Sequence, residues 1–115
     1  MSSPITTHVL DTANGHPGRG ITVILQRRDA DGDWEELTRG VTDDDGRISD
    51  WLPAGEAVPP GVYRAIFDVE GYFDQTEDQR FYSEIPIVFH LNHPDEHYHV
   101  PLLLSPYGYT TYRGS

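Results

Sequence analysis

Short runs of alternating apolar and polar residues dominate the sequence. The alternation is clearest in residues 20–28, where the aliphatic side chains of Ile21, Val23 and Leu25 share one face of an extended chain. Asn-Gly and Asp-Gly pairs and several prolines, which favour turns, separate the runs. The pattern predicts strands at residues 5–11, 20–28, 34–42, 47–52, 62–69, 84–91, 97–105 and 107–113.

Eight short strands joined by turns are typical of an all-β fold in which two sheets pack face to face. Only one segment, residues 73–80, is predicted to form a helix, and it is short and polar. A chain of 115 residues is long enough for one hydrophobic core and too short for two. We therefore expect a single domain spanning residues 1–115.

Composition narrows the possible chemistry. The chain has no cysteine, which excludes disulfides, thiolate metal ligands and a cysteine nucleophile. Its formal net charge of −11 disfavours nucleic acid and anionic membrane surfaces as partners. Much of the acid lies in turn-like stretches such as residues 29–33 and 43–46, which we interpret as solvated loops. A site for an anionic ligand would have to use the few arginines and histidines.

No targeting segment is visible in the sequence. Residues 1–8 lack both the basic and the apolar region of a secretory signal, and residues 113–115 do not match the peroxisomal signal. No apolar run approaches the roughly 18 residues that a membrane-spanning helix needs. These observations favour a cytoplasmic protein.

The histidines are the first candidates for catalysis. His97 and His99 share one face of a strand in a spacing that metal sites use, but two ligands do not make a site, so we expect no bound metal. His8 lies in the middle of a strand, on the same face as Thr6 and Leu10. Such a histidine is either a satisfied polar residue or a general base, because imidazole titrates near neutral pH.

Arg47 and the end of the chain are the other candidates. Arg47 follows the acidic turn at residues 43–46, so its guanidinium either pairs with those aspartates or binds a carbonyl or anion. Chain ends usually fray, yet residues 107–115 keep a strand-like pattern to the last position. This end either forms an edge strand without chemical function or brings an arginine and a carboxylate to a fixed place.

Motifs spread over nearly the whole chain resemble one family. They are TTHVLDT at 6–12, GHP at 15–17, DGR at 45–47, FYSEIP at 81–86, HYHVPLLLSP at 97–106 and YRGS at 112–115. With this combination the chain is similar to the transthyretin-related 5-hydroxyisourate hydrolases. The YRGS end is the most specific part of the resemblance, since it separates these hydrolases from the hormone-carrying transthyretins.

The resemblance implies a transthyretin-like two-sheet β-sandwich of eight strands with one short helix. It also implies a homotetramer built from two dimers, with active sites in a channel between the dimers and with no cofactor or metal. The residues it implies are His8, Arg47 and His99 for catalysis, and Tyr112, Arg113, Gly114 and Ser115 for substrate binding.

The reaction implied is ring opening of 5-hydroxyisourate to 2-oxo-4-hydroxy-4-carboxy-5-ureidoimidazoline in urate degradation. One histidine of the pair His8 and His99 would activate water and the other would orient the substrate, in an order that the sequence leaves open. Arg47 would stabilise developing negative charge. The alternative is a transthyretin-like carrier that binds an aromatic ligand in the same channel, which polar residues at the channel floor disfavour.

Overall fold

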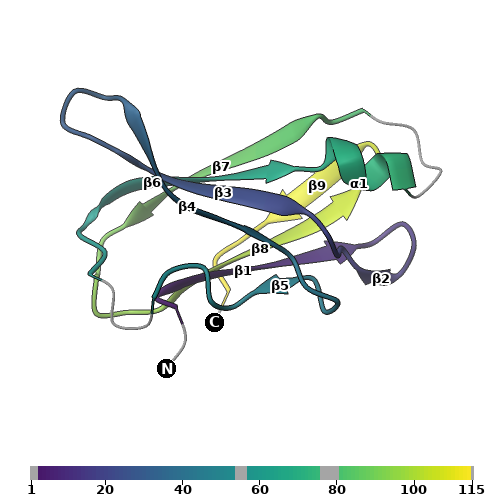
Figure 1. Cartoon of the computed structure of the whole chain (residues 1–115), viewed down its shortest axis with the longest axis horizontal. Helices are drawn as coiled ribbons and strands as arrows, with labels where there is room; N and C mark the ends of the chain where they lie inside the picture. The colour runs from purple at the N-terminus through teal and green to yellow at the C-terminus, as the bar shows by residue number, and fades with distance from the viewer. Residues whose placement is uncertain (1–2, 54–56, 76–80, 115) are drawn as a thin grey trace.

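The protein is a sandwich of two β-sheets with one short helix at one end (Figure 1). The computed structural model describes residues 3–53, 57–75 and 81–114. The first sheet contains β1 (Ile5–Asp11), β2 (His16–Pro17), β5 (Arg47–Ile48), β8 (Tyr98–Ser105) and β9 (Gly108–Thr111). The second sheet contains β4 (Trp34–Val41), β3 (Thr22–Arg28), β6 (Gly61–Asp68) and β7 (Glu84–Leu91), in that order across the sheet.

The first sheet brings the two ends of the chain together. Strand β1 pairs with β8 in parallel, with Thr6 opposite His99 and His8 opposite Pro101. Strand β9 adds to the far side of β8 in antiparallel fashion, and the short strands β2 and β5 both pair with the free side of β1. Residues of β5, β1 and β8 therefore lie side by side on the outer face of this sheet.

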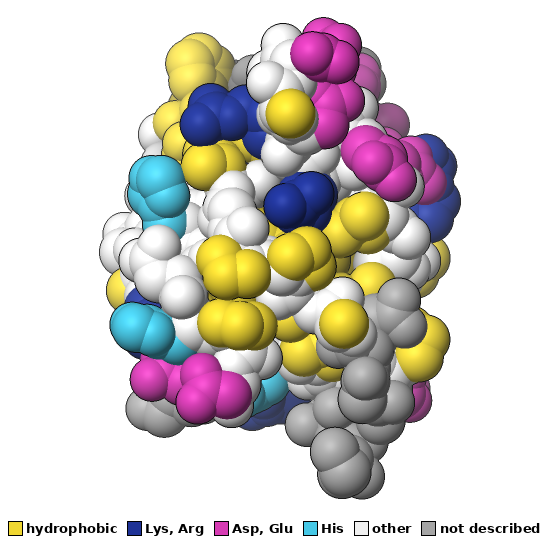
Figure 2. All heavy atoms as spheres, turned by 90° about the vertical axis from the view of Figure 1, so that its left-hand side faces the viewer, with side chains coloured by type: hydrophobic (Ala, Val, Ile, Leu, Met, Phe, Trp, Pro, Cys, Tyr) yellow, Lys and Arg dark blue, Asp and Glu magenta, His cyan; other side chains and the backbone are white. Residues whose placement is uncertain are grey.

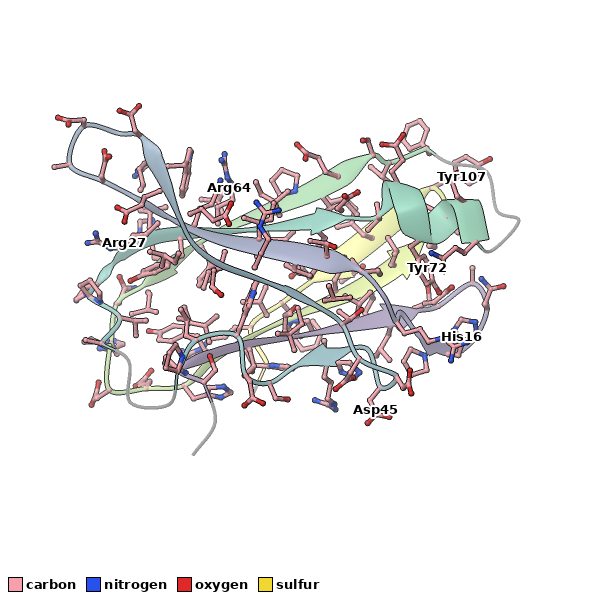
Figure 3. The ribbon with its side chains drawn as sticks, in the orientation of Figure 1. His16, Arg27, Asp45, Arg64, Tyr72 and Tyr107 are labelled. Atoms are coloured by element: carbon pink, nitrogen blue, oxygen red, sulfur yellow. The ribbon has the colours of Figure 1, made fainter. Side chains whose placement is uncertain are left out.

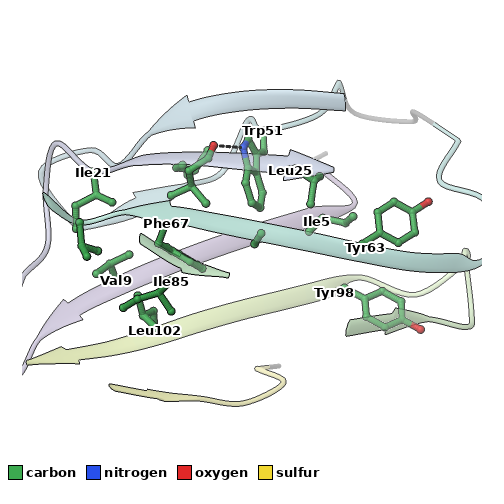
Figure 4. Close-up of a cluster of buried hydrophobic side chains, with 14 of the residues drawn as sticks. Ile5, Val9, Ile21, Leu25, Trp51, Tyr63, Phe67, Ile85, Tyr98 and Leu102 are labelled. Atoms are coloured by element: carbon green, nitrogen blue, oxygen red, sulfur yellow. Dashed lines mark hydrogen bonds between the residues drawn. The ribbon is translucent and has the colours of Figure 1, made fainter. Parts of the chain in front are cut away.

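The core fills the space between the sheets with alternate side chains of the strands. Ile21, Val23 and Leu25 are all fully buried, as their alternation predicts. Tyr63 and Phe67 of the neighbouring strand β6 are also fully buried and extend the same face of the second sheet (Figure 4). Because each strand gives its other face to solvent, the functional side chains of the first sheet project outward from a packed support.

The predicted all-β sandwich with one short helix is confirmed. It differs from the prediction at β2, at the end of β5 and at the start of the helix. The described residues contain a counterpart of each predicted strand and one further strand, the two-residue β2. The strand predicted at 47–52 ends at Ile48, because the chain then bends to bury Trp51, whose indole N–H donates to the carbonyl of Val23 at 3.3 Å.

The helix begins earlier than predicted. Helix α1 spans Glu70–Gln75 and buries Tyr72 and Phe73, whereas the prediction covered residues 73–80. The part of that prediction at residues 76–80 lies outside the described residues. No helix in the described ranges is long and apolar enough to cross a membrane.

The acidic stretch at residues 29–33 forms the exposed loop between β3 and β4, as predicted. Figure 2 shows one group of acidic side chains at the upper right of the face it presents, on the side where Figure 1 places this hairpin, and another group at the lower left. The loop joins two strands of the second sheet, whereas β1, β5 and β8 belong to the first sheet.

Candidate active site

Arg47 and His8 are neighbours across two paired strands. Strand β5 pairs with β1 in antiparallel fashion so that Arg47 lies opposite His8. Residues directly opposite each other in such a pair project to the same face of the sheet, with Cβ atoms about 5 Å apart. The guanidinium and the imidazole therefore share the outer face of the first sheet.

A tight turn holds Arg47 in this place. One carboxylate oxygen of Asp43 accepts hydrogen bonds from the backbone N–H groups of Asp45 and Arg47, at 2.9 and 3.0 Å. Gly46 has φ of 76°, and a side chain there would collide with the backbone carbonyl of Val9. The turn thus needs glycine at position 46, and Figure 3 shows Asp45 next to β5 at the outer face of the lower sheet.

Asp43 of this turn binds the backbone of Arg47, and the side chain of Arg47 is exposed. Among the described residues no carboxylate lies within ion-pair distance of that guanidinium. The structure therefore contradicts the alternative in which the Arg47 guanidinium only pairs with its neighbouring aspartates. The cation instead acts on the two histidines, since it lowers the pKa of both His8 and His99.

A backbone carbonyl sets the tautomer of His8. The Nε2 atom of His8 lies 3.0 Å from the carbonyl oxygen of Asp45. A carbonyl only accepts hydrogen bonds, so Nε2 carries the proton and Nδ1 of the neutral ring keeps its lone pair. Burial, followed by the charge of Arg47, lowers the pKa of His8 below its ordinary value, against smaller opposing effects of Asp45 and Asp43. His8 is thus a neutral base at neutral pH.

His99 lies next to His8 on the adjacent strand, with 6.4 Å between the ring centroids. Its Nδ1 atom is 2.8 Å from the hydroxyl oxygen of Thr6, and the same oxygen is 3.0 Å from Nε2 of His97. Burial, then the charges of Arg47, His8 and His97, lower the pKa of His99. The site therefore holds two neutral imidazoles beside one permanent cation.

The end of the chain packs against His99. The backbone N–H of Gly114 donates to the carbonyl of His99 at 2.8 Å, and the two residues form an isolated antiparallel bridge. A Cβ atom on Gly114 would lie 2.5 Å from Cδ2 and 3.2 Å from Cγ of the His99 ring. Only glycine allows the terminal segment to approach the imidazole this closely.

Arg113 fixes the terminal segment to β8. Its guanidinium lies 4.2 Å from the ring centroid of Tyr98 and forms an exposed ion pair with Glu96 at 3.1 Å. The same group donates to the carbonyl of His97 at 3.4 Å. The Arg113 side chain, to which the family resemblance gives a role in substrate binding, therefore contacts three groups of its own chain.

Tyr112 is 55% exposed and lies beside His99 at a cavity of about 240 Å³ between β7 and the pair β8 and β9. Apolar side chains, including those of Ile87, Phe89 and Val100, supply much of the cavity wall. A phenol at such a place offers a flat wall and a polar tip to a planar ligand.

The structure brings His8, Arg47 and His99 side by side and packs Gly114 against the His99 ring. Tyr112 and Arg113 line a cavity together with His99, and the lining of this cavity includes neither His8 nor Arg47. Ser115 lies outside the described residues. Within the described ranges no group of three or more His, Asp or Glu side chains is arranged to hold a metal ion. Sequence reasoning placed Thr6 on the face of His8 and missed the contacts of its hydroxyl, for which the sequence offers only the two-residue spacing as a signal.

Comparison with known proteins shows the family of the chain. The model of the HIUase/transthyretin family matches residues 5–114. The chain belongs to the HIUase/transthyretin family. Within this family it is 46% identical to the 5-hydroxyisourate hydrolase of Salmonella typhi, over 99% of this chain and 82% of that protein. It is 44% identical to the 5-hydroxyisourate hydrolase of Mus musculus, over 99% of this chain and 97% of that protein.

Solved structures of a 5-hydroxyisourate hydrolase and of a transthyretin resemble this fold. The 5-hydroxyisourate hydrolase of Klebsiella pneumoniae superposes with a TM-score of 0.83 at 32% identity, covering 96% of this chain and 97% of that one. Sea bream transthyretin in complex with thyroxine superposes with a TM-score of 0.89 at 33% identity, covering 97% and 95%. The fold is thus common to a hydrolase and a thyroxine-bound transthyretin, so the fold alone does not distinguish them.

Proposed function

We propose that this protein hydrolyses 5-hydroxyisourate to 2-oxo-4-hydroxy-4-carboxy-5-ureidoimidazoline, a step of urate degradation. The observation that carries the proposal is the row formed by Arg47, His8 and His99 on the outer face of the first sheet. Hydrolysis of a cyclic amide is helped by a base for water, a hydrogen-bond donor and a stabiliser of negative charge. Two neutral imidazoles can act as the base and the donor, and the cation can stabilise the charge. Relatives of high coverage carry the name of this activity.

In the proposed reaction His8 activates the water. Its fixed tautomer leaves the Nδ1 lone pair to take a proton, and its lowered pKa keeps that lone pair available at neutral pH. The hydroxide oxygen bonds to the ring carbonyl carbon, and the carbon–nitrogen bond then breaks. His8 returns its proton to the leaving nitrogen, and the new carboxylic acid loses its own proton to solvent.

The other residues of the site bind and stabilise in this proposal. Arg47 stabilises the negative charge that develops on the attacked carbonyl oxygen, an effect typically worth about 3–4 kcal/mol. Tyr112 forms a wall for the planar substrate. Arg113 anchors the terminal segment through its contacts with Glu96 and Tyr98, which supports a positioning role at least as well as direct contact with substrate.

The carrier function is the alternative, and the likeness to thyroxine-bound sea bream transthyretin keeps it testable. A carrier of an aromatic hormone needs a deep and largely apolar slot. Here the outer face of the first sheet presents His8, His99 and Arg47, which favours polar chemistry over a hydrophobic slot. The identities of 46% and 44% to proteins named as hydrolases favour the same choice.

We also propose that the protein is a metal-independent, cytoplasmic homotetramer. The absence of cysteine fits a reducing compartment. Strands β7 and β9 end their sheets in the described part of the chain, which supports pairing of these edges between subunits. Light scattering after size-exclusion chromatography measures the assembly directly, and a mass of one or two chains would contradict the tetramer.

The test of the function is the ultraviolet decay of freshly generated 5-hydroxyisourate, with and without chelator-treated protein. We expect acceleration that survives chelation and that falls by about 10²- to 10⁴-fold in His8→Ala or His99→Ala, because positioned acid–base groups contribute this much. His16→Ala is the matched control, since His16 lies in β2 at the other end of β1 (Figure 3). No acceleration by the folded wild-type protein would refute the hydrolase and favour the carrier.

A further inference from the structure

The hydroxyl of Thr6 is buried and bridges His97 and His99. The proposed mechanism gives this hydroxyl no role. Thr6 is only 7% exposed, and its hydroxyl oxygen contacts Nδ1 of His99 and Nε2 of His97 at 2.8 and 3.0 Å. The register of the sheet sets these contacts, because Thr6 lies directly opposite His99 in the parallel pair of β1 and β8. His97, two residues before His99 along the chain, is exposed to solvent.

The two hydrogen bonds of this bridge must run in opposite directions. A hydroxyl group has one proton and two lone pairs, and among the described residues the two histidine nitrogens are the hydrogen-bond partners of the Thr6 hydroxyl. If both rings donated to it, its buried proton would have no acceptor, so it donates to one imidazole nitrogen and accepts from the other. In one arrangement Thr6 donates to His99 and accepts from His97, and both rings then carry their proton on Nε2. In the other arrangement Thr6 donates to His97 and accepts from His99, and both rings carry their proton on Nδ1. The tautomers of the two histidines are therefore coupled.

Simple chemistry selects the first arrangement. A neutral histidine ring in water is more stable with its proton on Nε2, and the first arrangement gives this tautomer to both rings. A protonated His97 would select it as well, because an imidazolium ring has only donors to offer to Thr6. Both protonation states of the exposed His97 thus direct the Thr6 hydroxyl proton towards His99.

We propose that Thr6 is a positioning residue that fixes His99 as a hydrogen-bond donor through Nε2, with His97 as the outer support of the bridge. A neutral imidazole held in this tautomer can polarise a substrate carbonyl without transferring its proton. His8 has the same tautomer, but the carbonyl of Asp45 accepts its Nε2 proton, so His8 offers the lone pair on Nδ1 and not a donor. The structure thus assigns the donor to His99 and the base to His8, a division that rests on the proposed hydrolase function.

The tautomer is measured without substrate, by nitrogen-detected NMR of the histidine side chains in the full-length protein. In the wild type we expect a protonated Nε2 and an unprotonated Nδ1 in His99. In Thr6→Val the Nδ1 atom of His99 loses the hydroxyl that donates to it, so we expect neutral His99 with its proton on Nδ1 to become detectable while Arg47 and His8 remain in place. Thr6→Ser keeps the hydroxyl and restores the wild-type tautomer.

Thr7→Val is the matched control, because Thr7 is a buried neighbour whose hydroxyl donates to the backbone carbonyl of Val100 at 2.6 Å and not to a histidine. In the decay assay we expect kcat to fall about tenfold in Thr6→Val, which is less than the roughly 10²- to 10³-fold cost of removing an oriented donor outright, because the His99 ring itself remains. Thr6→Ser and Thr7→Val should retain kcat within about twofold, well short of either loss.

Three results would overturn the proposal. The first is a proton on Nδ1 of wild-type His99, which needs no variant and so decides the question even if Thr6→Val does not fold. The second is an unchanged tautomer of His99 in Thr6→Val, and the third is the same loss of kcat in Thr7→Val. If the wild type does not act on 5-hydroxyisourate, the hydrolase fails while the NMR result still decides the role of Thr6.

Discussion

A single methyl group at Gly114 tests whether the end of the chain positions the catalytic histidine. Gly114 lies beyond β9 and joins β8 through the hydrogen bond of its N–H to the carbonyl of His99. In Gly114→Ala the new Cβ would stand 2.5 Å from Cδ2 of His99. Either the imidazole or the terminal segment has to move, and both belong to the proposed site.

The size of the effect follows from this distance. Carbon atoms in contact normally stand about 3.5–4.0 Å apart, so relief of the clash needs a shift of about 1 Å. A misplacement of about 1 Å in a catalytic arrangement can reduce the rate by about 10²-fold. We therefore expect kcat/KM for 5-hydroxyisourate to fall about a hundredfold. The fold should persist, because Gly114 is partly exposed and contributes nothing to the core.

The assay compares Gly114→Ala with Gly108→Ala. Gly108 begins β9, and a Cβ there would meet only the hydroxyl oxygen of Ser105 at an ordinary 3.7 Å. Both variants lose the same backbone freedom, so they differ in the contact with His99. Initial rates of 5-hydroxyisourate decay give kcat/KM, and thermal unfolding of both proteins gives the change in Tm.

Two outcomes would contradict the reasoning. Wild-type kcat/KM in Gly114→Ala would mean that the close approach of the terminal segment has no catalytic role. An equal loss in Gly108→Ala, or a large fall of Tm in Gly114→Ala alone, would mean that the variants act through folding and not through the position of His99.

Two further predictions concern charge and stability. Arg47→Gln removes a cation that lowers the pKa of both His8 and His99, so both pKa values should rise. More of each ring is then protonated at a given acidic pH, and the acid limb of the kcat/KM profile moves to higher pH. A pH profile from 5 to 8 with an unmoved limb would refute this. Tyr72→Phe removes the hydroxyl that donates to the buried carboxylate of Asp11, and we expect a loss of about 1–3 kcal/mol of unfolding free energy with unchanged kcat. Urea unfolding measures the loss, and full stability would show that the Asp11 carboxylate is satisfied without it.

Local pattern predicted the strands because period two is a property of each strand by itself. Alternation in residues 20–28 is enough to bury Ile21, Val23 and Leu25 on one face. The prediction fails where a distant contact overrides local preference. Trp51 leaves the extended path after β5 because its indole ring packs in the core and donates to Val23, which no local pattern reveals.

The candidate site divides in the same way. The sequence places Thr6 and His8 on one face of a strand, but it does not say which strand lies beside them. The resemblance to a family implies His99 and Arg47 as their partners, and the register of β1 with β8 and β5 brings these residues side by side. The tautomers of the histidines depend on single hydrogen-bond partners across these strands, so only the structure provides an argument for them.

The site also explains how stability and activity separate in this protein. Thr6 and His99 are 93 residues apart in sequence, so the row of site residues exists only after β1 and β8 have paired. Loss of core or support contacts, as in Tyr72→Phe, changes the fraction of molecules that are folded and leaves each folded site intact. Changes on the outer face, such as those at Thr6 and Gly114, alter the geometry of His99 in molecules that are fully folded. Measurements of Tm and kcat on the same variants should therefore fall into two groups, and a variant of the outer face that lost activity only in proportion to its folded fraction would contradict this separation.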